Sequence, residues 1–86
     1  MPTHSHEFVE RYDGLVGFGA DRITDEATVM VYLQKFSDDA LLERIVGRLS
    51  DEELSEIFDL INRLMHAHFT EDEYHRLFLK DHHHTP

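Results

Sequence analysis

Four times along this 86-residue chain, an apolar residue is followed by Ser or Thr and then by two acidic residues. The four copies are ITDEA at 23–27, FSDDA at 36–40, LSDEE at 49–53 and FTEDE at 69–73. A Ser or Thr hydroxyl at a helix start accepts a hydrogen bond from a backbone N–H that the helix leaves unpaired, and acidic residues there interact favourably with the helix dipole. The pattern therefore predicts helix N-caps at Thr24, Ser37, Ser50 and Thr70.

Two of these helix starts are complete capping boxes, because Glu53 and Glu73 stand three residues after Ser50 and Thr70. The longest predicted helix runs from about 51 to 67. Its apolar residues recur at the spacing of a single helical face, and they are Leu54, Ile57, Phe58, Ile61, Leu64 and Met65. Helices are also predicted from about 38 to 48 and from about 71 onward.

The N-terminal part of the chain is less regular. Apolar residues from Phe8 to Val16 keep helical spacing, which predicts a first helix from about Ser5 to Val16. The glycines of GLVGFGADR then indicate a helix end and a loop. Residues 27–34 are rich in β-branched side chains and could form a strand. The acidic start before them and the lack of a partner strand favour a helix.

Together these elements predict an all-α protein, with four or five short helices in a compact bundle or orthogonal array and no sheet. A chain of this length is expected to form one domain with a modest core. Residues 1–4 and 81–86 fall outside the predicted helices and are expected to be mobile tails. Because so small a core supplies limited stability, an additional apolar face buried against a second copy would stabilise the fold.

Charge and composition limit the possible partners. Eighteen acidic residues against eight Lys and Arg give a formal net charge of -10, and the basic residues are scattered along the chain. Nucleic acids and anionic membranes bind proteins through clustered Lys and Arg, so neither is an expected partner. The chain has no cysteine, which excludes disulfides and thiolate-held metals and favours the cytoplasm for so small a domain. No signal peptide and no apolar run of membrane-spanning length is predicted.

Eight histidines raise the question of a metal site. On the last predicted helix, Asp72 and Glu71 precede His75 by three and four residues, so all three can share a helical face. A carboxylate-x-x-His element resembles half of the ligand set of di-iron helical bundles, which need two such elements. A symmetric dimer could supply the second copy. The alternative is a solvated or salt-bridged helix face, and His82, His83 and His84 near the C-terminus would bind nickel or zinc only adventitiously.

No motif of an enzyme is recognised, and no cofactor is expected unless a divalent transition metal binds at His75. The leading hypothesis is a non-enzymatic interaction or regulatory module that binds itself, as a homodimer, or another protein. Leu77, Phe78 and Leu79 form a run of three apolar residues, which spans more than half a helical turn. At least one of these side chains is therefore expected at an interface. The alternative function is metal binding by the C-terminal helix.

Overall fold

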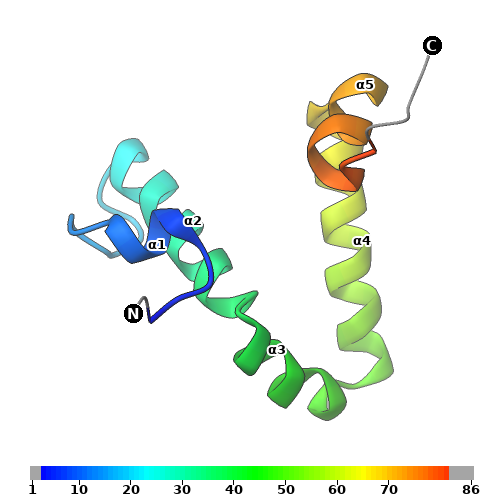
Figure 1. The fold of residues 1–86 in the computed structure, drawn as a ribbon, viewed down its shortest axis with the longest axis horizontal. Helices are drawn as coiled ribbons and strands as arrows, with labels where there is room; N and C mark the ends of the chain where they lie inside the picture. Colours follow the sequence, from blue (N-terminus) through cyan, green and yellow to red (C-terminus); the bar gives the residue numbers. More distant parts are fainter. Residues whose placement is uncertain (1–2, 82–86) are drawn as a thin grey trace. The chain divides into compact units, whose positions relative to one another are not determined.

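The protein is described from a computed structural model, which defines residues 3–81. All the regular structure in that range is helical, with no β-strand, so the all-α prediction is confirmed (Figure 1). The α-helices are α1 (Glu7–Arg11), α2 (Arg22–Phe36), α3 (Asp39–Ile45), α4 (Asp51–His68) and α5 (Glu71–Glu73). The 3-10 turn η1 (Val46–Arg48) extends α3, and the π-helical segment η2 (Tyr74–Leu79) extends α5.

The helices group into two compact units, residues 1–48 and residues 49–86. The first unit contains α1, α2, α3 and η1, and the second contains α4, α5 and η2. The expectation of a single domain stays a prediction.

In the first unit, α1 packs against α2. Val9 of α1 and Val31 of α2 are both buried, and so is the polar side chain of Thr28. The Thr28 hydroxyl accepts a hydrogen bond from the backbone N–H of Gly17 at 3.0 Å and donates one to the Gly17 carbonyl at 3.3 Å. These contacts hold the loop before α2 against the helix, and they satisfy the one buried polar side chain of the described core.

Side chains of α2 and α3 also hold the N-terminal segment. The Gln34 side-chain oxygen accepts a hydrogen bond from the backbone N–H of Val9 at 2.8 Å. The Asp38 carboxylate accepts hydrogen bonds from the Ser5 hydroxyl at 2.8 Å and the Ser5 N–H at 3.1 Å, and it also caps α3 by accepting from Ala40 N–H. These bonds, with the Ser5 hydroxyl contributing most, hold the pKa of Asp38 below its ordinary value.

Two of the predicted N-caps are wrong. Helix α2 begins at Arg22, and its cap is Asp21, whose carboxylate accepts a hydrogen bond from Thr24 N–H at 2.8 Å. Thr24 therefore lies inside the first turn. Helix α3 is capped by Asp38, and Ser37 instead ends α2. In both places an acidic side chain one to three residues from the predicted cap serves the same function as the hydroxyl, because Asp is as good an N-cap as Ser.

The first helix is also shorter than predicted. It spans Glu7–Arg11, and Tyr12 already has an extended backbone. The Tyr12 hydroxyl donates a hydrogen bond to the carbonyl of Leu15 at 2.8 Å, which closes a turn instead of a further helical turn. The prediction that the first helix continues to Val16 is therefore wrong, although the apolar residues beyond Tyr12 keep helical spacing. Residues 27–34, in contrast, are helical as favoured from the sequence.

The second unit begins with the longest helix. Ser50 caps α4 and Thr70 caps α5, and both form complete capping boxes with Glu53 and Glu73 as predicted. The Thr70 N–H donates to the Glu73 carboxylate at 2.8 Å, which is the main reason that the pKa of Glu73 is lowered. After one turn the last helix changes to π-helical winding and ends at Lys80, which has a left-handed backbone. The helix predicted from about residue 71 is therefore present, and its π-helical winding beyond Glu73 is the feature that the sequence did not predict.

Two residues of the predicted N-terminal tail are held in place. The backbone N–H groups of Thr3 and His4 donate to the Glu10 carboxylate at 3.0 and 2.7 Å. Both bonds lower the pKa of Glu10, and the bond from Thr3 has the larger effect. Of the residues predicted as C-terminal tail, Asp81 donates its N–H to the His75 carbonyl at 3.0 Å. The remaining predicted tail residues, 1–2 and 82–86, lie outside the described part of the chain.

Candidate interaction surface

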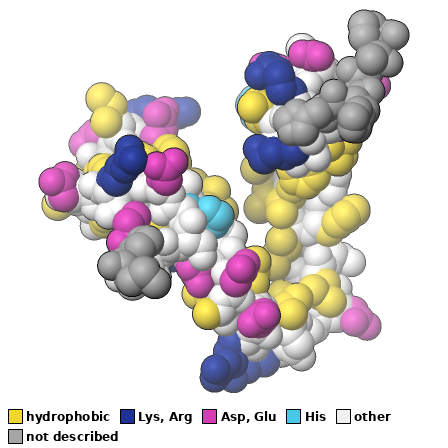
Figure 2. Space-filling model, viewed as in Figure 1, with side chains coloured by type: hydrophobic (Ala, Val, Ile, Leu, Met, Phe, Trp, Pro, Cys, Tyr) yellow, Lys and Arg dark blue, Asp and Glu magenta, His cyan; other side chains and the backbone are white. Residues whose placement is uncertain are grey.

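The most extensive apolar surface of the second unit lies along α4. Successive residues of an α-helix are rotated by about 100°, so residues three and four apart share a face. Figure 2 shows the hydrophobic side chains of α4 gathered along one side of the helix. We call this set the α4 stripe, and its members are Leu54, Ile57, Phe58, Ile61, Leu64 and Met65.

Most of the α4 stripe is exposed to solvent: Leu54, Phe58, Ile61 and Leu64 are exposed, and Ile57 and Met65 are half-buried. Phe58 is 67% exposed and Ile61 42% exposed, and none of the α4 residues is buried. Leu60 borders the stripe and is 46% exposed. The opposite side of the helix is polar, with Glu56, Asp59 and Arg63. Burying one such large apolar side chain is worth about 1.5–3 kcal/mol, so leaving several of them in water is a substantial cost.

The predicted C-terminal interface residues are exposed as well. Leu77, Phe78 and Leu79 lie in η2, and each is about half exposed. The ring of Phe78 stacks on that of Tyr74, with centroids 5.5 Å apart. This contact covers one face of the Phe78 ring. Their assignment to an interface stays a prediction.

The candidate metal ligands lie around His75. Its Nε2 is 4.0 Å from the nearer Glu71 carboxylate oxygen, and its Nδ1 is 3.6 Å from that of Asp81. Asp72 is directed to Arg76 instead, at 3.8 Å. Asp81 therefore takes the place that the sequence suggested for Asp72, because the chain reverses at Lys80 and brings residue 81 back to His75. No local pattern of residues indicates this reversal.

Within residues 3–81 no three His, Asp or Glu side chains are grouped in a way that could hold a metal ion. His66 and His68 are at the end of α4, where a histidine interacts favourably with the helix dipole. In the first unit, His6 is hydrogen-bonded to the Ser37 hydroxyl at 2.9 Å. His82, His83 and His84 lie outside the described residues.

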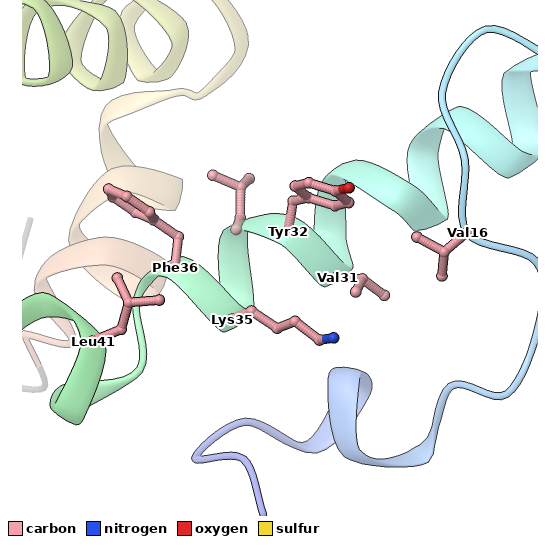
Figure 3. Close-up of a pocket in the computed structure, with 7 residues that line it drawn as sticks. Val16, Val31, Tyr32, Lys35, Phe36 and Leu41 are labelled. Carbon is pink, nitrogen blue, oxygen red and sulfur yellow. The ribbon is translucent and has the colours of Figure 1, made fainter.

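The first unit has an apolar hollow of its own that the sequence did not predict. It measures about 590 Å³ and is open to solvent (Figure 3). Tyr32 and Phe36 of α2, Leu41 of α3 and Val16 of the preceding loop line it. Lys35 also lines it and supplies the one charged group. Nothing in the residues around the hollow identifies a ligand, so we assign it no function.

No helix among the described residues is long and apolar enough to cross a membrane. The comparison with known proteins found no relative: no family model, no curated protein and no solved structure matches this chain. Among the described residues, the exposed α4 stripe is the feature with the clearest physical consequence.

Proposed function

We propose that this protein is a small cytoplasmic, non-enzymatic interaction module that binds another protein chain through the α4 stripe. The observation that supports this most is the exposure of the stripe on the longest and most regular helix. A helix with one apolar face is stabilised mainly by packing that face against another element. Because large exposed apolar surfaces in soluble proteins mark interaction sites, the α4 stripe has the properties of a docking surface.

The apolar residues of η2 extend this proposal. Leu77, Phe78 and Leu79 belong to the same unit as α4 and are exposed with it. We assign them to the same interaction function, with Phe78 or Leu79 contacting the bound chain. The net charge of -10 makes a protein a better partner than a nucleic acid or an anionic membrane, because the last two repel an acidic surface.

Site-specific photo-crosslinking tests the proposal. The crosslinking residue benzoylphenylalanine replaces Phe58 in the middle of the stripe, and in a matched control it replaces Arg63 on the opposite side of α4. Irradiation in the native cells is expected to join residue 58 to a second protein chain, with little product from residue 63. Products confined to a single copy of the chain, or equal yields from the two positions, would refute the proposal.

A further inference from the structure

The α4 stripe is symmetric about its central residue, Ile61. Phe58 and Leu64 lie three residues before and after it, and Ile57 and Met65 lie four residues before and after it. The stripe therefore has the same spacing read in either direction. Two copies of α4 can pack antiparallel about a two-fold axis beside Ile61, and each then presents the same patch to the other, as an isologous dimer requires.

We infer that the chain bound at the α4 stripe is a second copy of this protein, antiparallel to the first; this inference rests on the proposed function. The 100° rotation per residue determines the contacts. Ile61 of one copy packs on Ile61 of the second copy. Leu64 and Met65 of one copy pack on Ile57 and Phe58 of the other.

The charge along α4 favours the antiparallel direction. All the acidic residues of the helix precede Ile61, and they are Asp51, Glu52, Glu53, Glu56 and Asp59. After Ile61 the helix contains Arg63, His66 and His68 and no acidic residue. An antiparallel pair places the acidic half of one copy beside the half of the other that has no acidic residue, and it also opposes the two helix dipoles. A parallel pair would place the two acidic halves side by side, where they repel.

His68 provides one specific contact of this kind between the two copies. It lies seven residues after Ile61 and continues the stripe, while Leu54 lies seven residues before Ile61. In the antiparallel pair, His68 of one copy therefore meets Leu54 of the second copy, next to Glu53. One oxygen of the Glu53 carboxylate accepts a hydrogen bond from Ser50 N–H at 2.9 Å. In the proposed pair, the other oxygen is available to the His68 imidazole of the second copy.

The length of the stripe indicates that η2 takes part. From Leu54 to His68 the helix rises about 21 Å, which is only two heptads and short for a pair of helices that associate alone. An open hollow between α4 and the last segment is lined by residues of both, among them Met65, Phe69 and Tyr74. In the antiparallel pair this region lies beside the first turns of the second α4. Leu77, Phe78 and Leu79 are then close enough to the second copy to add apolar contact.

Disulfide trapping tests the inference directly, because the chain has no cysteine of its own. The variants Ile61→Cys, Leu54→Cys and Arg63→Cys are each oxidised with diamide, which accepts the two electrons and two protons that a pair of thiols releases. Ile61→Cys is expected to give a covalent dimer of twice the 10.2 kDa chain mass. Leu54→Cys and Arg63→Cys are expected to stay monomeric, because in the antiparallel pair each of these residues is far from the same residue of the second chain.

A double variant gives the positive control for direction. Leu54→Cys combined with His68→Cys is expected to form the dimer that neither change forms alone. Dimer formation by Leu54→Cys as readily as by Ile61→Cys would show a parallel pair and overturn the inference. It would also be overturned if the wild type sediments as a monomer at all concentrations and Ile61→Cys forms no dimer. In that case, a photo-crosslink from residue 58 to a different protein would still support the proposed function.

Discussion

The two units of this protein stabilise their helices by different means. In the first unit, side chains of α2 and α3 hydrogen-bond to segments far away in the sequence. Gln34 accepts from Val9 N–H across 25 residues, and Asp38 accepts from Ser5 across 33. In the second unit, the side-chain hydrogen bonds of the two capping boxes, of Asn62 and of Lys80 are local and join residues three or four apart.

The two units also differ in how far their own side chains are buried. The first unit has buried residues of its own, Val9, Thr28 and Val31, whereas no residue described in the second unit is buried. Capping boxes fix where α4 and α5 begin, but they do not cover an apolar face. Because helices in proteins derive most of their stability from packing that face, α4 needs contacts that its own unit does not supply. We therefore expect folding of α4 to be coupled to association.

The largest expected effect comes from Ile61→Glu at the centre of the α4 stripe. In the proposed dimer this change places two carboxylates beside each other in an apolar contact, where an unpaired charge is costly. The dissociation constant is expected to rise more than about 100-fold, which corresponds to about 2.7 kcal/mol. Sedimentation equilibrium measures the association, and amide hydrogen exchange is expected to show loss of protection in α4 and none in α2.

Asp59→Asn is the matched control, since Asp59 lies on the polar side of the same helix. It is expected to leave both the association and the hydrogen exchange of α4 close to those of the wild type. If Ile61→Glu lowers protection in α2 as much as in α4, the two units do not stabilise their helices independently and by different means.

The next effect is in the first unit, at Gln34. Its side-chain oxygen pairs the partly buried N–H of Val9, so Gln34→Ala leaves that donor without a partner. Leaving a buried donor unpaired typically costs about 1–3 kcal/mol. Chemical denaturation is expected to show this loss without any change in sedimentation. Gln34→Glu, which keeps an acceptor oxygen at the same position, is expected to retain most of the stability, and an equal loss in both variants would argue against a role of this bond.

Leu79→Glu tests whether η2 belongs to the same interface as the α4 stripe. Because Leu79 is about half exposed in the single chain, the change is expected to leave the fold of one copy intact. It is expected to weaken the dimer about tenfold, or about 1.4 kcal/mol, by removing apolar contact at the edge of the interface. Sedimentation equilibrium beside the wild type measures this, and Lys80→Gln, which lowers the net charge by the same one unit at the neighbouring position, is the control. Equal effects of the two changes would remove η2 from the interface.

Ser50→Ala changes a local feature of the second unit. It removes the hydroxyl that accepts from Glu53 N–H at 3.1 Å and is expected to cost about 0.5–2 kcal/mol. Ser55→Ala, within the same helix, removes a hydroxyl that has no capping role and is expected to change the thermal midpoint little. A thermal melt in which the two variants coincide would mean that the capping box does not stabilise α4.

The features that the sequence predicted correctly are those determined within a few residues. The capping boxes at Ser50 and Thr70 and the full extent of α4 follow from neighbouring residues alone. At Thr24 and Ser37 the same reasoning failed, because Asp21 and Asp38 are equally good caps one to three residues away. Which of the two side chains caps the helix depends on the path of the chain before the helix begins. For Asp38 this includes a hydrogen bond to Ser5, which no local pattern reveals.

The candidate surfaces show the same limit. The spacing of the apolar residues identifies the α4 stripe, but an amphipathic helix has the same pattern whether its face meets the rest of its own unit or another chain. Leu77, Phe78 and Leu79 were predicted at an interface because three consecutive apolar residues exceed one helical face. The approach of Asp81 to His75 could not be predicted, since it depends on the left-handed backbone at Lys80.

The smallest expected effect is the response to acid, and it distinguishes the two units once more. Hydrogen bonds from backbone and hydroxyl groups lower the pKa of Glu10, Asp21 and Asp38 in the first unit and of Glu73 in the second. Each of these carboxyl groups binds its proton more readily in the unfolded chain, where its pKa is near 4.5 for Glu and 3.8 for Asp. Their contribution to stability is therefore complete above these values and is lost as the pH falls through the lower pKa values of the folded protein.

Because three of these four groups lie in the first unit, acid is expected to weaken α1 and α2 before it weakens the start of α5. Amide exchange between pH 5 and pH 3, corrected for the intrinsic exchange rate, measures the order. Asp38→Asn serves as the matched variant, since it keeps an acceptor for the Ser5 hydroxyl but no longer titrates. It is expected to lower stability at neutral pH and to flatten the acid response of the first unit. An unchanged acid response in this variant would mean that the hydrogen bonds to Asp38 do not couple protonation to the folding of the first unit.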